Sequence, residues 1–365
     1  MRIALVSPEP TPYRAPLFDR VAAHPDVELT VVYAAETVAS RTWTVQLDHP
    51  AVFLGGTTVP GARALFRHDY PVTPGIFRAL GEARPDVVVV SGWSTFASQS
   101  ALLWCRVRRV PYVLLVESHD AGPKAGWRRT VKGTAVPPIV RNAASVLVVG
   151  TLARESVVAH GADPSRVRVF TNTIDVDVWM MRAEARARDQ RHDGVVTVVS
   201  VARLAPEKGL DVMLRAVTAA GLRAVVVGSG PERERLEALA PDAVFTGELP
   251  EDGVAQAYVD ADIFALLSAH EPWGVVVNEA AASGLPLVLS DRVGAAADLL
   301  RDGENGVLVP FGDIEAAAAA FRMLAGDSEL RSAYGARSRE LASAWGYEPS
   351  VDAFVAACRE AIASR

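Results

Sequence analysis

The amino-acid sequence predicts an α/β protein built from two doubly wound domains, each with a parallel sheet. Short runs of Val, Ile and Leu alternate with segments of helical spacing, as they do in repeated strand–helix–strand units. The runs are continuously apolar, which is typical of strands that helices cover on both faces. The chain has 365 residues, and this length corresponds to two domains rather than one.

The predicted strands form two sets along the chain. The first set lies at 2–7, 27–33, 87–91, 112–117 and 146–150. The second set lies at 195–201, 224–228, 243–246, 263–268 and 287–290. The charged segment 179–194 separates them and is typical of a solvated helix or linker. We therefore predict a first domain over 1–174 and a second over 175–345, with functional residues just after strands, where ligands bind in such sheets.

Composition and charge exclude several classes of protein. The chain carries 37 Lys and Arg against 43 Asp and Glu, a net charge of −6, which argues against a dedicated nucleic-acid binder. The wide separation of the two cysteines, Cys105 and Cys358, argues against a disulfide framework and a zinc site. The first apolar run is too short for a signal peptide, and no run approaches the ~20 residues of a membrane span. We therefore expect a cytoplasmic protein.

The most informative segment is SAHEPWGVVVNEAAASGLPLVLSD, residues 268–291, which follows a predicted strand. A helix is expected over 274–283, because a Pro–Trp–Gly turn precedes it and a glycine and a proline follow it. Glu271 precedes this helix and Glu279 lies inside it, so the two carboxylates are placed to hold two ends of one ligand. The free N–H groups at the helix start form an anion site, made by Gly274, Val275 and Val276. Taken alone, Glu271 is also compatible with a partner of the helix dipole and Glu279 with a solvated helix residue.

A second segment, SVARLAPEKGLD, residues 200–211, follows the first strand of the second domain. Its loop carries Arg203 and Lys208 and opens onto the predicted cleft. Two cations in this position suit a diphosphate, whose negative charge grows when a bond to it breaks. In isolation, the same pair is compatible with two surface cations near helix acids.

Taken together, these segments resemble the family 4 glycosyltransferases over nearly the whole chain. The resemblance is carried by the Arg203–Lys208 loop, by Glu271 and Glu279 with seven residues between them, and by the GLPLVLSD that follows. Further similar stretches are TNTIDVDVW, VGSGPERERLEAL and DGENGVLVP.

The resemblance implies a retaining enzyme of the GT-B fold, with two Rossmann-like domains and a nucleotide-diphosphate sugar as donor. It implies that Arg203 and Lys208 hold the diphosphate and that Glu271 binds sugar hydroxyls beside the amides of residues 274–276. It implies that Glu279 binds the ribose hydroxyls. Neither a metal nor another cofactor is expected, because these cations and amides stabilise the leaving diphosphate.

Three residues of the first domain complete the expected site. His119 follows the strand at 112–117, and the resemblance places it opposite the donor sugar; the alternative is a loop histidine that contacts backbone. The first strand is followed by SPEPTPYRAPLF, which lacks the glycine-rich turn often found in the family, so backbone approach to the diphosphate is harder. Tyr13 and Arg14 lie there, and we expect them on the acceptor side.

Two further expectations concern surfaces. The stretch 121–153 carries Lys124, Arg128, Arg129, Lys132 and Arg141 around Trp127 and has no acidic residue. It suggests a contact with an anionic acceptor or the inner membrane, or a solvated basic face. The resemblance also implies that residues 346–365 form a helix that crosses back onto the first domain.

We therefore predict a glycosyltransferase that moves a sugar to an acceptor hydroxyl, with a UDP sugar preferred to a GDP sugar as donor. The acceptor is expected to be lipid-linked, a glycan or a small molecule, in capsule, glycolipid or natural-product glycosylation. Two alternatives stay open: a nucleotide-sugar epimerase on the same fold and a catalytically inactive homologue that binds sugar nucleotides. An epimerase should need more acid–base groups than His119, and the four charged residues after the strands argue against an inactive protein.

Overall fold

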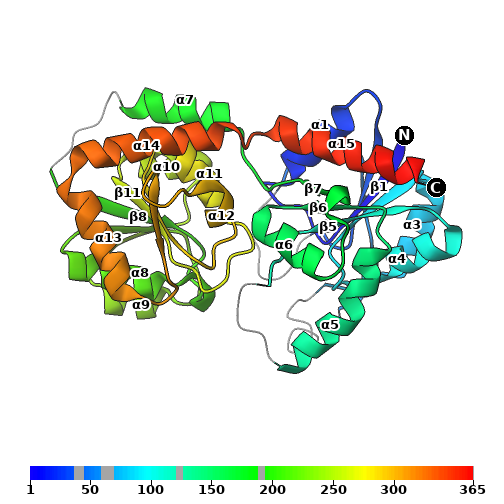
Figure 1. The fold of residues 1–365 in the computed structure, drawn as a ribbon, viewed down its shortest axis with the longest axis horizontal. Helices are drawn as coiled ribbons and strands as arrows, with labels where there is room; N and C mark the ends of the chain where they lie inside the picture. The colour runs from blue at the N-terminus through cyan, green and yellow to red at the C-terminus, as the bar shows by residue number, and fades with distance from the viewer. Residues whose placement is uncertain (37–44, 59–69, 121–125, 188–193, 365) are drawn as a thin grey trace.

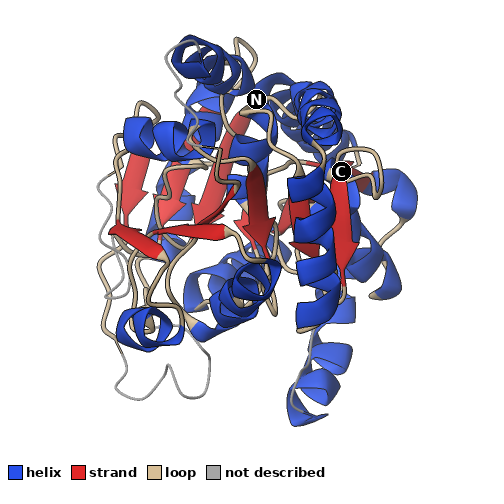
Figure 2. Ribbon diagram, turned by 90° about the vertical axis from the view of Figure 1, so that its left-hand side faces the viewer, coloured by secondary structure: helices blue, strands red, loops and turns tan. Residues whose placement is uncertain are grey.

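The computed structural model of the chain describes residues 1–36, 45–58, 70–120, 126–187 and 194–364. Two α/β domains lie side by side, each built around its own sheet (Figure 1). Helices lie on either side of the strands (Figure 2). The predicted fold class is therefore confirmed.

The sheet of the first domain has seven strands within the described residues, all paired in parallel. In spatial order they are β3 (Ala51–Phe53), β2 (Glu28–Tyr33), β1 (Arg2–Ser7), β4 (Val87–Ser91), β5 (Tyr112–Val116), β6 (Ser145–Val148) and β7 (Val167–Val169). Its helices are α1 (Ala15–Ala23), α3 (Ile76–Ala83), α4 (Phe96–Arg108), α5 (Gly126–Arg141) and α6 (Thr151–Ala159). Every residue of the central strand β4 is buried, as expected for a strand covered on both faces.

The sheet of the second domain has six strands in the described part of the chain, also parallel. In spatial order they are β10 (Val244–Gly247), β9 (Arg223–Val227), β8 (Thr197–Val201), β11 (Ile263–Leu266), β12 (Leu287–Ser290) and β13 (Gly306–Val309). Its helices are α8 (Leu210–Ala220), α9 (Arg233–Leu239), α10 (Glu251–Val259), α11 (Val275–Ala282), α12 (Ala296–Leu299), α13 (Ile314–Gly326) and α14 (Ser328–Ser343).

Two helices lie near the crossings between the domains. α7 (Val176–Ala187) contains most of the segment expected to be solvated, and that expectation was wrong for one of its faces. Trp179 and Ala183 are buried, because this face packs on α10 and α11. At the end of the chain, α15 (Tyr347–Ala363) follows α14 and lies over the first domain (Figure 1). There it buries Phe354 and Cys358 in the core beside Phe170.

Three strands were not predicted. β3 and β7 have three residues each, and β3 is partly exposed, so neither shows a long apolar run. β13 has only four residues and begins with Gly306, and glycine is uncommon in strands. A Cβ at Gly306 would lie 2.0 Å from the carbonyl oxygen of Leu287, so glycine is needed for the two strands to approach.

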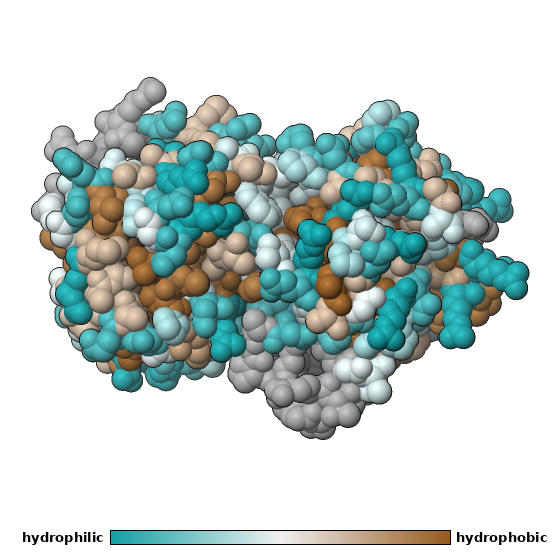
Figure 3. Space-filling model, viewed as in Figure 1, coloured by the Kyte–Doolittle hydropathy of each residue, from teal (hydrophilic) through white to brown (hydrophobic). Residues whose placement is uncertain are grey.

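The exposed large apolar residues are scattered over both domains (Figure 3). None of the described helices combines the length and the apolar character needed to cross a bilayer.

Candidate active site

The start of α11 is shaped by a glycine. Gly274 has a φ of +96°, a left-handed conformation that favours glycine. A Cβ there would lie 3.1 Å from Cγ of Glu271 and 3.3 Å from Cδ2 of Leu266. The turn bond at this helix start runs from the N–H of Val277 to the carbonyl oxygen of Gly274, at 2.9 Å. The amides of residues 274–276 therefore precede the helical ladder, as an anion site requires.

The backbone of Glu271 is fixed on both sides by the strand-like segment that follows β12. Its N–H donates to the carbonyl oxygen of Arg292 at 3.1 Å, and its own carbonyl oxygen accepts from the N–H of Gly294 at 2.9 Å. The carboxylate pairs with the ammonium group of Lys208. The two side chains are only 13% and 20% exposed, so water screens this ion pair less than a surface pair.

Lys208 ends a short 3₁₀ helix, Pro206–Lys208, which follows β8. The next residue, Gly209, has a φ of +62° and packs so closely that a Cβ would lie 2.0 Å from the carbonyl oxygen of Leu267. The N–H of Ala269 also donates to the carbonyl oxygen of Glu207 at 2.9 Å. These contacts hold the Lys208 loop against the Glu271 loop.

Arg203 lies further toward the surface. Its guanidinium pairs with Glu207, and its side chain is 51% exposed. The structure thus brings Lys208 directly onto Glu271 and leaves Arg203 at the rim with a readily exchanged partner.

Glu279 lies inside α11 and lines a pocket of about 350 Å³ between the domains. Its Oε2 accepts a hydrogen bond of 2.9 Å from the phenol of Tyr258. Burial raises the pKa of Glu279 to about 7, while the bond from Tyr258 opposes this rise and the negative charge of Glu251 adds to it.

The pocket takes its walls from both domains. The first domain contributes Pro12, Tyr13, Pro16 and Arg20, and the rest of the wall is formed by Thr173, Ile174, Asp175, Val178, Trp179, Glu251, Val275, Glu279 and Tyr347. Burial, with the negative charge of Glu117, raises the pKa of Tyr13 to about 12, so its phenol stays protonated.

His119 connects the domains. Its Nε2 lies 3.0 Å from the carbonyl oxygen of Glu271, a geometry in which Nε2–H donates. Its ring meets that of His270 edge to face, with 4.9 Å between the centroids. The predicted histidine therefore lies at Glu271, across the domain boundary, and contacts backbone there.

Arg14 is buried and bonded to other residues of the first domain. Its side chain is 4% exposed, it pairs with Glu117, and its Nε donates to Oδ1 of Asn172 at 3.1 Å. It thus ties the loop after β1 to the segment that leads out of β7. The adjacent Tyr13, rather than Arg14, faces the pocket.

The predicted basic stretch falls largely outside what the structure describes. Lys124 lies outside the described residues, as do the side chains of Trp127, Arg128, Arg129 and Lys132, although α5 itself is described. The side chain of Arg141 packs beside Gly161.

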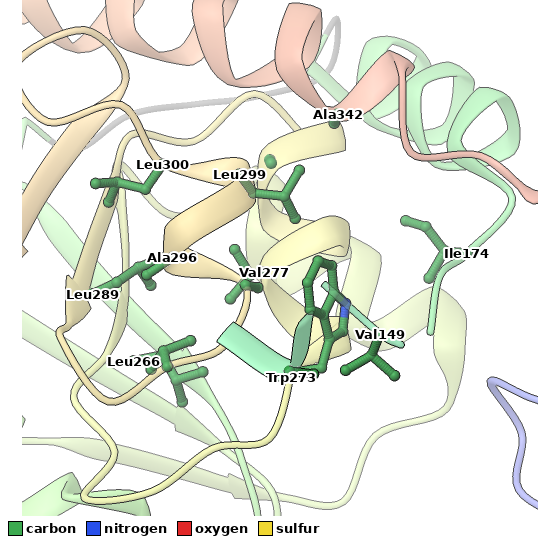
Figure 4. Close-up of a cluster of buried hydrophobic side chains, with 14 of the residues drawn as sticks. Val149, Ile174, Leu266, Trp273, Val277, Leu289, Ala296, Leu299, Leu300 and Ala342 are labelled. Atoms are coloured by element: carbon green, nitrogen blue, oxygen red, sulfur yellow. The ribbon is translucent and has the colours of Figure 1, made fainter. Parts of the chain in front are cut away.

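Sequence reasoning missed a further contact between the domains. Oδ2 and Oδ1 of Asp298 accept bonds from the N–H and Oγ1–H of Thr151 at 2.9 and 2.6 Å. Beside it Trp273 packs against Val149 (Figure 4). A Cβ at Gly150 would lie 2.3 Å from Cζ3 of Trp273. Nothing local in the sequence signals these pairs, because their members come from different domains.

No group of three or more His, Cys, Asp and Glu side chains that could hold a metal ion occurs among the residues that the structure describes.

Comparisons with known proteins agree with this architecture. The family model described as "Glycosyl transferases group 1" matches residues 181–341, and that described as "Glycosyl transferase 4-like domain" matches residues 19–173. The chain is 34% identical over 265 residues to a GDP-mannose-dependent alpha-mannosyltransferase of Mycobacterium tuberculosis, covering 71% of this chain and 67% of the relative.

A second relative is the GDP-mannose-dependent alpha-(1-6)-phosphatidylinositol monomannoside mannosyltransferase of Mycolicibacterium smegmatis. It is 28% identical, and the match covers 81% of this chain and 82% of the relative. Among solved structures, Anabaena Alr3699/HepE in complex with UDP superposes with a TM-score of 0.75 at 21% identity, over 100% of both chains. The chain therefore belongs to the family 4 glycosyltransferases and is a glycosyltransferase of the GT-B fold.

Proposed function

We propose that the enzyme transfers a sugar from a nucleoside-diphosphate sugar to a hydroxyl group of its acceptor, with retained configuration. One observation carries the proposal. Lys208 and Glu271 meet at the amino end of α11, and Glu279 of the same helix lines the pocket between the domains. A donor that lies along this helix would place its sugar at Glu271, its diphosphate at Lys208 and the free amides, and its ribose at Glu279.

The diphosphate would take the place at the start of α11. Lys208 would turn from Glu271 to the phosphates, Arg203 would exchange Glu207 for them, and the amides of residues 274–276 would point at the same charge. Positive groups held in advance stabilise the negative charge that grows on the leaving diphosphate. The proposal therefore requires no divalent metal ion.

The transferred sugar would lie between Glu271 and His119. Once Lys208 has turned away, the carboxylate of Glu271 is free to accept bonds from sugar hydroxyls. His119, which already lies at the backbone of Glu271, would face the sugar from the first domain. Contact with both domains would favour their closure over the donor and exclude water.

The nucleoside would occupy the pocket at Glu279. Its volume of about 350 Å³ suits a small ligand, and a carboxylate is the group that commonly binds the two ribose hydroxyls. The preference for uridine as the base stays a prediction: both relatives described above are named for GDP-mannose, whereas HepE was solved with UDP.

A donor screen tests the proposal. Purified enzyme is scanned for a rise in Tm with UDP-glucose, UDP-galactose, GDP-mannose and their free nucleotides, and the preferred donor is then incubated with glycolipid and soluble sugar acceptors. Transfer, with the anomeric configuration of the product read by NMR, supports the proposal. Epimerised donor without transfer would favour an epimerase, and binding without transfer or hydrolysis would favour an inactive homologue.

A further inference from the structure

A tyrosine of the second domain is joined to the carboxylate that lines the pocket. Tyr258 of α10 is fully buried, and its ring packs edge to face on Trp179 and Phe264, with 5.9 Å between centroids in both cases. Its phenol donates to Oε2 of Glu279 at 2.9 Å. A second, longer acceptor, the carbonyl oxygen of Val276, lies 3.4 Å from the phenol oxygen. A buried phenol needs such a partner, and here the partner faces the pocket.

This hydrogen bond uses only one of the two oxygens of the Glu279 carboxylate. Oε2 of Glu279 is held by Tyr258, while Oε1 has no protein hydrogen-bond partner in the described parts of the chain. Glu279 is also desolvated by burial, and burial favours the protonated form of a carboxyl group. A donated O–H favours the ionised form, so the phenol works against that tendency.

We propose that Tyr258 is a positioning residue for donor binding: it fixes Glu279 through Oε2 and favours its ionised form, so that Oε1 is presented to the ribose hydroxyls. The inference rests on the proposed function, because it assigns the nucleoside to this pocket. Its distinctive consequence is that a residue which never touches the donor sets the pH range in which the donor binds.

The other charged or titratable groups around Glu279 do not replace this role. Glu251, at the start of α10, adds negative charge and pairs with Arg182 of α7. Arg20 pairs with Asp175 at 3.2 Å and lies over the ring of Tyr347. The remaining groups are Tyr13 in the pocket wall and Arg339 of α14, which donates to Ser283 at the far end of α11. In the described structure, Tyr258 is the group that donates a hydrogen bond to the carboxylate of Glu279.

The test is Tyr258→Phe, which keeps the packed ring and removes one hydroxyl. The Kd of the preferred nucleotide sugar is measured calorimetrically from pH 5.5 to 9; its phosphodiester groups do not titrate in this range. In the wild type, affinity should fall below a midpoint near pH 7. In Tyr258→Phe the midpoint should move about one pH unit higher, so affinity at pH 7 falls about fivefold and converges with the wild type by pH 9. KM should rise at pH 7 with kcat unchanged.

Two controls make the result specific. Tyr334→Phe, at a buried tyrosine of α14, should leave the profile unchanged. Glu279→Gln should bind weakly without pH dependence, and adding Tyr258→Phe to it should change nothing further.

A Tyr258→Phe profile that superposes on the wild-type profile would overturn the inference. If Tyr258→Phe proves unstable, a second loss of affinity when it is combined with Glu279→Gln would overturn it too. A wild type that binds no nucleotide sugar would instead overturn the proposed function.

Discussion

The pairing of Lys208 with Glu271 predicts that removing one of these charges will strengthen the binding of a product. In the free enzyme the ammonium group already has a carboxylate partner, and a diphosphate must compete for it. In Glu271→Gln the competing charge is gone. We therefore expect UDP or GDP to bind more tightly, while the intact donor loses its sugar contacts and turnover falls.

The size of the effect follows from the burial of the pair. Exposed ion pairs contribute about 1 kcal/mol or less, whereas breaking a fully buried pair costs about 3–5 kcal/mol. With 20% and 13% of the side chains exposed, the Lys208–Glu271 pair lies between these limits. A release of about 1–2 kcal/mol corresponds to nucleotide binding about 5–30-fold tighter.

Calorimetric titration of each nucleotide into wild type and Glu271→Gln measures the change. Glu237→Gln is the matched control, because it removes the same charge from an exposed pair with Arg233 on α9 and should leave the Kd unchanged. Unchanged or weaker nucleotide binding in Glu271→Gln would show that Lys208 does not exchange Glu271 for the diphosphate, and the assignment of the phosphate site would fail.

Four further variants test other parts of the site. Lys208→Ala should lower kcat about 10²-fold or more with an unchanged circular dichroism spectrum, and near-normal turnover would refute its role. The folded-state pKa of Glu279 is about 7, above its ordinary value, so the stability it contributes is complete at low pH and is lost as pH rises through 7; Glu279→Gln should raise Tm at pH 8.5 but barely at pH 5. Gly150→Ala places a Cβ 2.3 Å from Trp273, so unfolding should become easier by about 1–3 kcal/mol and small-angle scattering should show more separated domains; unaltered scattering would contradict this. Gly274→Ala forces a φ of +96° on a residue with a Cβ, and donor affinity should fall more than at Gly326→Ala, where the Cβ meets open space.

The sequence predicted features with local signals and missed those made by distant residues. The strand at 87–91 was placed correctly because a run of valines between turn residues has one ready interpretation. The helix after Gly274 was predicted within a residue at each end, because glycines and a proline mark its limits. Lys208 and Glu271, 63 residues apart, were assigned to one site because both follow strands of one parallel sheet, and they do meet.

The missed features have no such signals. Tyr258 looks like any apolar residue of a helix until α10 packs on α11, and Asp298 looks like a solvated acid until Thr151 arrives from the other domain. The burial of Arg14 depends on Glu117 and Asn172, which the chain brings together only in the folded domain, and its place on the acceptor side stays a prediction. Burial of a polar side chain by remote partners leaves no periodicity to detect.

The return of α15 to the first domain has a consequence for the order of biosynthesis. During synthesis, β1 to β7 emerge from the ribosome long before Phe354, Cys358 and Ala361 are translated. These three side chains nevertheless complete the core of the same domain. The first domain therefore keeps an uncovered hydrophobic surface until α15 has been synthesised. Its core is completed only after the whole second domain has been synthesised, because that domain lies between β7 and α15 in the chain.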